Sequence, residues 1–175
     1  RGGIGHGKAA GNYAASLYAS RIATNMGYTQ VLWLDSVEKK YVEEVGTSNI
    51  FFVIGDELIT PPLGGSILPG VTRNSVITLA RYLGTNVVER PISIEEVIKT
   101  SGNGSLKEAF ASGTAAVISP VGHIYFRDKE YAINGGKTGA LAEKLYNEIL
   151  KIQYGMVEDP FGWRIKIANG KKRSR

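Results

Sequence analysis

The sequence has 175 residues, of which 43% are hydrophobic and none is cysteine. This composition is typical of one folded domain with a proper core, and it excludes a disordered, collagen-like or disulfide-stabilised chain. Because cysteine is absent, the chain has no thiol nucleophile, cysteine-ligated zinc or iron–sulfur cluster. No segment approaches the roughly 20 apolar residues of a membrane helix, so we expect a soluble protein without a membrane partner.

The net charge of +5 comes from 21 Lys and Arg against 16 Asp and Glu, and the excess gathers at one end. Lys171, Lys172, Arg173 and Arg175 lie at the end of the chain, and the rest of the sequence is nearly neutral. A short basic segment of this kind is usually solvated. We therefore expect residues 169–175 to form a basic tail, and we expect no nucleic-acid partner.

The first part of the chain predicts one helix followed by strands. Tyr13, Leu17 and Ile22 recur near the helical period, which predicts a helix over residues 9–26. The short apolar runs that follow predict strands, and Gly55-Asp56 is a hairpin signal between the last two. These strands are expected at residues 31–34, 41–45, 50–54 and 57–60. A loop rich in proline and glycine follows at residues 61–70.

The second part of the chain predicts further helices and strands. Apolar stripes predict helices over residues 72–83 and 139–153, and Ser93 with Glu96 forms a capping box that opens a short helix. Strands are expected at residues 87–88, 115–118 and 123–126. Strands outnumber helices and come partly as hairpins, so the sequence predicts an α+β fold.

A glycine-rich segment opens the chain and looks like a phosphate-binding P-loop. Residues 2–8 fit the pattern G-x-x-x-x-G-K. The next P-loop position is Ser or Thr, whose hydroxyl binds magnesium, and Ala9 has no hydroxyl. Nucleotide binding is therefore a remote alternative.

Lys8 lies between this loop and the first predicted helix. A helix N-terminus disfavours a cation and lowers the pKa of an amine, which is what a lysine that forms a Schiff base requires. An exposed lysine at a helix end is the alternative that the residues alone leave open.

A series of segments, in natural order and spacing from Arg1 to about Ile167, resembles branched-chain aminotransferases. These enzymes use pyridoxal 5'-phosphate (PLP) and have the D-amino-acid-aminotransferase-like fold, fold type IV. The segments are Lys8-Ala-Ala-Gly-Asn-Tyr-Ala-Ala-Ser, Gln30-Val-Leu-Trp-Leu-Asp, Glu44-Val-Gly-Thr-Ser-Asn-Ile-Phe-Phe, Leu68-Pro-Gly-Val-Thr-Arg, Ser112-Gly-Thr-Ala-Ala, Ile152-Gln-Tyr-Gly and Glu158-Asp-Pro-Phe-Gly-Trp.

The resemblance implies a role for each residue around the cofactor ring. Lys8 would hold PLP as an internal aldimine and then act as the base that moves a proton between substrate and cofactor. Tyr13 would donate a hydrogen bond to the phenolic oxygen of the cofactor. Glu44 would pair with the pyridine nitrogen and keep it protonated. Leu68 would pack on one face of the ring.

The phosphate and the substrate are assigned to the loops in the same way. Val71 and Thr72, at the start of the second predicted helix, would bind the phosphate together with Thr114. The amides of Thr114 and Ala115 would receive the substrate carboxylate. Gln30 and Thr47 would line the side-chain pocket. No metal site is expected.

The resemblance also implies an organisation and an activity. Residues 1–168 would be the C-terminal large domain, with a mixed or antiparallel sheet or pseudo-barrel and flanking helices, and a smaller N-terminal domain would precede it. The intact protein would be a cytoplasmic homodimer that transfers the amino group between leucine, isoleucine or valine and 2-oxoglutarate, giving glutamate, by a ping-pong route. The alternatives are a D-amino-acid aminotransferase, an aminodeoxychorismate lyase, or an inactive PLP-binding fragment.

Overall fold

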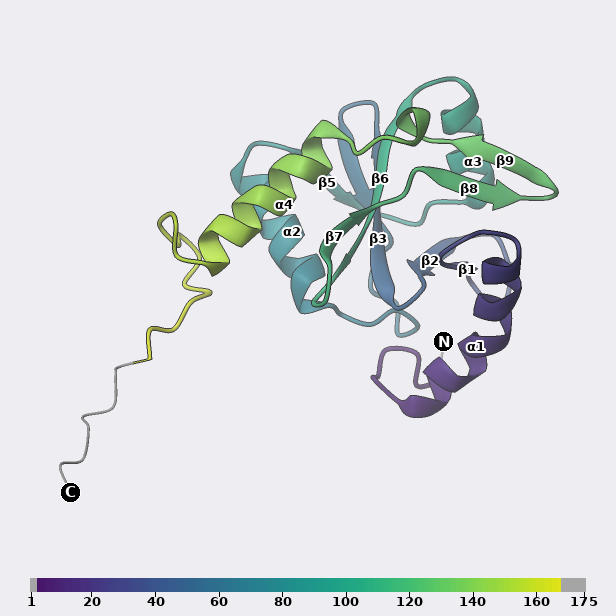
Figure 1. Cartoon of the computed structure of the whole chain (residues 1–175), viewed down its shortest axis with the longest axis horizontal. Coiled ribbons are helices and arrows are strands. Elements are labelled where there is room, and N and C mark those ends of the chain that lie inside the picture. Colours follow the sequence, from purple (N-terminus) through teal and green to yellow (C-terminus); the bar gives the residue numbers. More distant parts are fainter. Residues whose placement is uncertain (1–2, 168–175) are drawn as a thin grey trace.

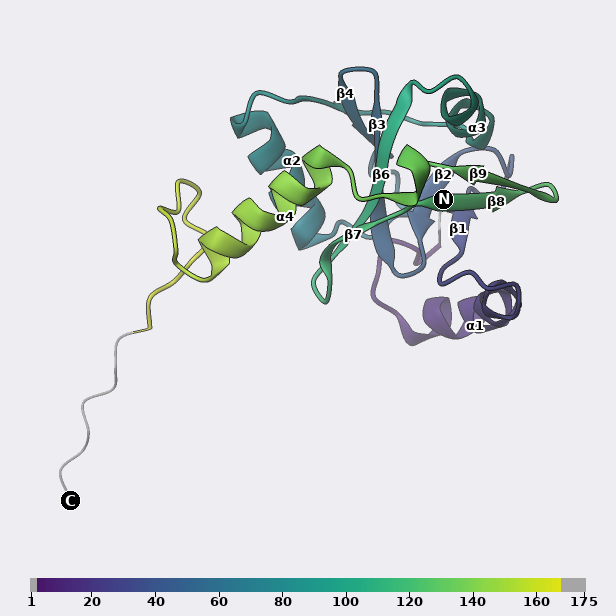
Figure 2. The same cartoon turned by 45° about the horizontal axis from the view of Figure 1, so that its top comes forward.

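The computed structural model describes residues 3–167, and the expected basic tail at residues 169–175 lies outside them. The elements of the described part are shown in Figures 1 and 2. In chain order they are α1 (Ala10–Asn25), β1 (Leu32–Leu34), β2 (Val42–Val45), β3 (Ser48–Ile54), β4 (Glu57–Thr60), α2 (Val71–Tyr82), β5 (Asn86–Glu89), α3 (Ile94–Gly102), β6 (Leu106–Gly113), β7 (Val117–Pro120), β8 (His123–Phe126), β9 (Lys129–Ala132), a 3₁₀ turn (Asn134–Gly136) and α4 (Ala140–Gln153).

Strand β3 is the centre of a mixed sheet. Strand β6 pairs antiparallel with it along one edge, from Asn49 to Ile54. The other edge is shared, because β2 pairs with the first two residues of β3 and β4 pairs with the last three. Strands β1 and β7 extend the sheet antiparallel, whereas β5 joins β4 in parallel. Strands β8 and β9 form a separate hairpin.

Two hydrophobic cores cover the two faces of this sheet. Alternate residues of β3 point to opposite faces, as the period of a strand requires. Phe51 contributes to the core under α2 and α4 and stacks on Phe110 with ring centroids 5.2 Å apart. Phe52 contributes to the other core, which α3 and the β8–β9 hairpin cover. Figure 1 shows α2 and α4 side by side on one side of β3 and β6, with α3 and the hairpin on the other.

Most of the predicted elements are present, and the α+β fold is confirmed. The hydroxyl of Ser93 accepts a hydrogen bond from the Glu96 amide at 3.0 Å, as the capping box predicts. The Gly55-Asp56 hairpin joins β3 and β4. The strand expected at residues 115–118 was misplaced, because residues 114–116 form the turn after β6 and the strand begins at Val117.

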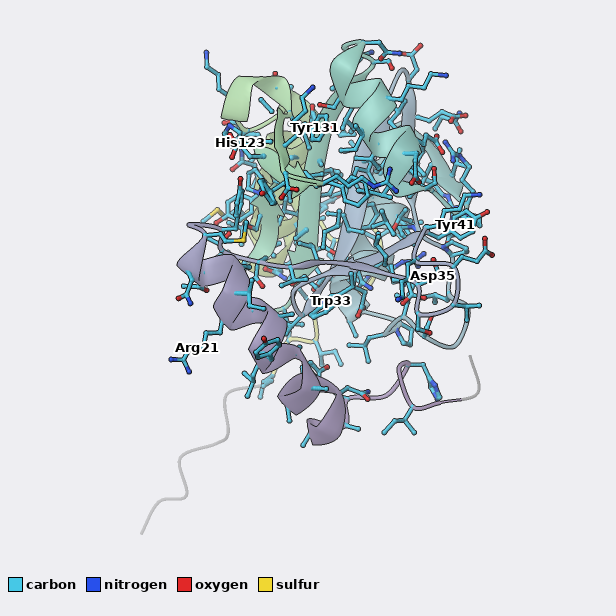
Figure 3. The ribbon with its side chains drawn as sticks, turned by 90° about the vertical axis from the view of Figure 1, so that its right-hand side faces the viewer. Arg21, Trp33, Asp35, Tyr41, His123 and Tyr131 are labelled. Atoms are coloured by element: carbon cyan, nitrogen blue, oxygen red, sulfur yellow. The ribbon has the colours of Figure 1, made fainter. Side chains whose placement is uncertain are left out.

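Helix α1 lies at the periphery and buries none of its residues. Its apolar side chains Leu17 and Tyr18 are 68% and 78% exposed. Figure 3 shows Arg21 on the side of α1 that faces away from the sheet. Among residues 3–167, no helix is both long enough and apolar enough to cross a membrane.

Candidate active site

A cavity of about 280 Å³ lies between the start of α1, strand β2 and the loop before α2. Four of the predicted site residues line it: Tyr13, Glu44, Thr47 and Leu68. These residues come from three separate segments of the chain: α1, strand β2 with the turn that follows it, and the loop before α2. The fold therefore brings together three of the four residues expected around the cofactor ring, Tyr13, Glu44 and Leu68, with Thr47 beside them.

Glu44 is the most constrained of these side chains. Its Oε1 atom accepts hydrogen bonds from the backbone amide of Leu68 and from Nδ2 of Asn49, both at 3.2 Å. Glu44 and Asn49 are direct partners across β2 and β3. Burial raises the pKa of Glu44 to about 7, although the hydrogen bond from the Leu68 amide acts in the opposite direction. The site thus holds a carboxyl group that ionises much less readily than an exposed one.

The loop before α1 reaches the same cavity. The side-chain amide of Asn12 donates to the carbonyl oxygens of Ile4 at 2.9 Å and Gly7 at 3.1 Å, which folds the loop back onto the helix. A Cβ on Gly5 would lie 2.7 Å from the carbonyl oxygen of Ser66, so glycine allows the loop to approach the segment before Leu68. Lys8 follows directly after Gly7, which lines the cavity, but Lys8 itself is exposed and is not among the lining residues.

The residues expected to bind phosphate lie at the start of α2 and in the β6–β7 turn. Val71 is the first residue of α2, is 76% exposed, and follows an N-cap glycine that provides no side-chain cap. Helix geometry leaves the amides of Val71 and Thr72 without an intrahelical acceptor. Thr114 and Ala115 are exposed in their turn, which lies beside the start of β3, because a Cβ on Gly113 would be 3.0 Å from the Ser48 hydroxyl. None of the four lines the cavity around Glu44.

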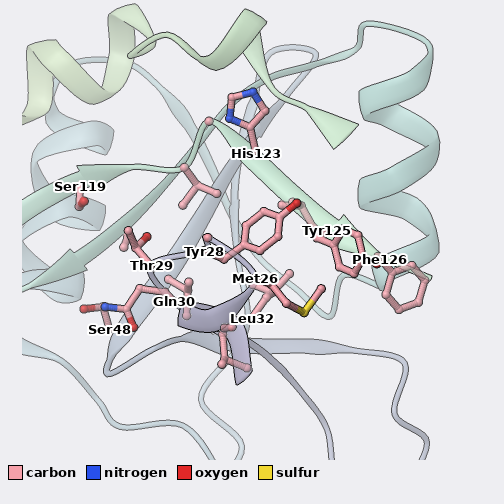
Figure 4. Close-up of a pocket in the computed structure, with 18 of the residues that line it drawn as sticks. Met26, Tyr28, Thr29, Gln30, Leu32, Ser48, Ser119, His123, Tyr125 and Phe126 are labelled. Carbon is pink, nitrogen blue, oxygen red and sulfur yellow. The ribbon is translucent and has the colours of Figure 1, made fainter. Parts of the chain in front are cut away.

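Gln30 lines a second, larger cavity of about 680 Å³ between the end of α1 and strand β8. Figure 4 shows Gln30 and Ser48 on one side of it, with Tyr125 and Phe126 on the other. Gly46 lies between the two cavities, and a Cβ on it would overlap the Gln30 carboxamide. The predicted pocket residues Gln30 and Thr47 therefore lie on either side of Gly46 and not in one cavity.

Two side chains of the site were not predicted from the sequence. Asn49 is only 5% exposed and joins Glu44 to the carbonyl oxygen of Leu68, which it contacts at 2.9 Å. Trp33 lines the smaller cavity and donates its ring N–H to the carbonyl oxygen of Gly46 at 2.9 Å. A polar residue directly before the apolar run of residues 50–53 was the one signal for Asn49.

Comparison with known sequences places the chain in a family. The sequence profile of class IV amino-transferases matches residues 5–124, and the chain belongs to this family. The chain is 55% identical over 168 residues to branched-chain-amino-acid aminotransferase 2 of Bacillus subtilis strain 168, covering 96% of this chain and 46% of that protein. The chain thus spans about half the length of the curated relatives it matches.

Solved structures give the same result at the level of the fold. The crystal structure of Escherichia coli branched-chain amino acid aminotransferase superposes with a TM-score of 0.80 at 33% identity, over 93% of this chain and 51% of that one. The enzyme of Thermobaculum terrenum, solved in its PLP form, superposes with a TM-score of 0.75 at 33% identity, over 90% and 48% of the two chains. The predicted fold type IV architecture is confirmed.

Proposed function

We propose that this chain is the PLP-binding part of a branched-chain-amino-acid aminotransferase. The reaction is amino transfer between leucine, isoleucine or valine and 2-oxoglutarate, in two half-reactions on one site. The observation that carries the proposal is Glu44, a half-buried carboxylate in a cavity that Tyr13 and Leu68 also line. Family membership and the PLP form of a solved relative support it.

The residues present fit this cofactor. No basic side chain forms an ion pair with Glu44 within residues 3–167, and burial raises the pKa of Glu44. A carboxylate in this state is stabilised by a cation, and a protonated pyridine nitrogen is one. The uncapped start of α2 offers amide donors of the kind that bind phosphate.

Each predicted residue then has a defined role. The Lys8 amine would bind the cofactor covalently and, once the amino group of the substrate has displaced it, would take the proton from the substrate Cα. Glu44 holds a proton at the ring nitrogen, and the Tyr13 hydroxyl donates to the ring oxygen. When bound, the cofactor supplies an electron sink for the charge left at Cα.

The phosphate and substrate contacts complete the assignment. The amides of Val71 and Thr72 hold the phosphate with the Thr114 hydroxyl, and Leu68 packs on the ring. The amides of Thr114 and Ala115 orient the substrate carboxylate. Gln30 and Thr47 contact the substrate side chain.

The domain organisation belongs to the same proposal. Residues 1–168 act as the large domain of a longer protein that works as a homodimer in the cytoplasm. The relatives' length supports a longer protein, since this chain covers 46% of the Bacillus subtilis enzyme. Gel filtration of the full-length protein tests the dimer directly.

The lysine assignment is tested by adding PLP to the full-length protein and to Lys8→Ala. We expect a visible absorption band of lysine-bound PLP in the first and none in the second. Lys99→Ala removes an exposed lysine from α3 and serves as the matched control, with the band retained. A band that survives Lys8→Ala would refute the assignment of Lys8.

The reaction is tested with leucine and 2-oxoglutarate, by measuring glutamate. Activity with D-alanine and none with leucine favours a D-amino-acid aminotransferase, and pyruvate release from aminodeoxychorismate favours the lyase. A PLP band without turnover of any substrate indicates an inactive binding protein. Stabilisation by ATP with magnesium, but not by PLP, restores the P-loop interpretation.

A further inference from the structure

Asn49 connects two parts of the proposed cofactor site. Its Nδ2 group donates to Oε1 of Glu44 at 3.2 Å and to the carbonyl oxygen of Leu68 at 2.9 Å. The amide of Leu68 donates to the same Glu44 oxygen at 3.2 Å. Both donors therefore converge on Oε1, and Oε2 forms no hydrogen bond within the described residues. This arrangement orients the carboxylate and leaves Oε2 available to a ligand.

The other end of the Asn49 carboxamide packs against the N-cap of α2. A Cβ on Gly70 would overlap Oδ1 of Asn49. Gly70 has φ −65° and ψ 135°, a conformation that any residue adopts, so its backbone does not require glycine. The requirement is steric, because only glycine leaves room for the Asn49 carboxamide beside the start of α2.

We propose that Asn49 is a positioning residue that holds the Glu44 carboxylate at a fixed separation from the first turn of α2. In the proposed function Glu44 would face the ring nitrogen and α2 the phosphate, so one buried side chain would set the distance between the two ends of the cofactor site. This inference rests on the proposed function of Glu44 and Val71. Asn49 is not among the residues that line the cavity, and it acts through Glu44 and Leu68, which are.

The test uses the full-length protein with Asn49→Ala, Gly70→Ala and the double variant. Asn49→Ala removes a hydrogen bond to a charged group, and we expect the dissociation constant for PLP to rise about tenfold. Gly70→Ala should have a similar effect, because the new methyl group displaces the carboxamide. In the double variant the methyl group has space, so binding should be no weaker than in Asn49→Ala alone.

Two spectroscopic measurements separate positioning from general destabilisation. The ¹⁵N signal of ring-labelled PLP reports protonation of its nitrogen, and the ¹³C signal of the Glu44 carboxyl in the apoprotein reports that group without cofactor. Both should shift in Asn49→Ala. Thr60→Val is the matched control, since Thr60 is fully buried on the neighbouring strand and its hydroxyl donates to Ile50 at 2.8 Å. It should lower stability and move neither signal.

The possible outcomes are distinct. If Glu44→Gln weakens PLP binding but Asn49→Ala behaves like Thr60→Val, the inference is wrong and the proposed function is unaffected. The inference is also overturned if Asn49→Ala raises the dissociation constant for PLP by the same factor in the wild-type protein and in the Glu44→Gln variant. If Glu44→Gln changes neither PLP binding nor the ring signal, both proposals fail. If Asn49→Ala does not fold, Gly70→Ala decides the question. Weaker PLP binding together with a shifted ¹³C signal of Glu44 in Gly70→Ala supports the inference, and the absence of both changes refutes it.

Discussion

The start of α4 depends on one buried carboxylate from β6. Glu108 is 9% exposed, and its two oxygens accept the amides of Leu141 and Ala142, each at 2.9 Å. The N-cap residue of α4 is Gly139, which supplies no side-chain cap. Glu108→Gln keeps the shape of the side chain, but its carboxamide NH₂ group then faces one of the two backbone N–H groups, so that two donors meet. One hydrogen bond to a charged group is lost and one buried donor is left without an acceptor, a loss of about 3 kcal/mol in the free energy of unfolding.

Urea unfolding and hydrogen exchange of the α4 amides measure this loss. The control is Glu143→Gln, which removes an exposed carboxylate from the first turn of the same helix without breaking a hydrogen bond to its amides. We expect the control to cost less than about 1 kcal/mol, because it loses only the interaction with the helix dipole. Faster exchange should appear first at Leu141 and Ala142. Equal losses in the two variants would refute the idea that Glu108 caps α4.

Two further predictions concern the site. Burial raises the pKa of Glu44 from 4.5 to about 7, so as pH rises from 4.5 to 7 the unfolded chain ionises first and the folded apoprotein loses stability. This loss should be absent in Glu44→Gln, and urea midpoints that fall equally in both proteins would contradict it. Gly46→Ala should displace the Gln30 carboxamide, and Gly46 also has φ 57°. We expect a raised KM for leucine with little change in PLP affinity, whereas Gly27→Ala, whose methyl group meets no other atom, should leave KM unchanged.

Local sequence signals predicted the elements that have clear boundaries. Glycine marks the ends of α1 and α2, the capping box marks α3, and the Gly55-Asp56 pair marks the hairpin. Strand β6 was missed, although it is central, because Lys107 and Glu108 interrupt its apolar pattern. Glu108 is buried there only because α4 supplies the amides that satisfy it, and that partner is distant in sequence. Strand β9 was missed for a related reason, since most of its residues are exposed.

The residues of the candidate site were predicted from the family resemblance, and the local sequence pattern alone pointed only to Lys8. Tyr13, Glu44, Thr47 and Leu68 are brought to one cavity by the start of α1, strand β2 with its following turn, and the loop before α2. Lys8 is exposed beside that cavity, and its assignment stays a prediction. The contact between Gly46 and Gln30 has no local signature, because it depends on the turn between β2 and β3 meeting the chain before β1.

Asn49 shows how a site can be recognised within a core. Strand β3 is buried on both faces from Asn49 to Val53. Asn49 is polar, and the four residues that follow it in this stretch are all apolar. An apolar residue at position 49 would extend the run and avoid the cost of burying an amide, so packing alone gives no reason for asparagine. Among the described residues, its Nδ2 group donates to Glu44 and Leu68 and to no other partner. Because those two partners are also the residues that line the cavity, the polar interruption of β3 is explained by the site and not by the stability of the sheet.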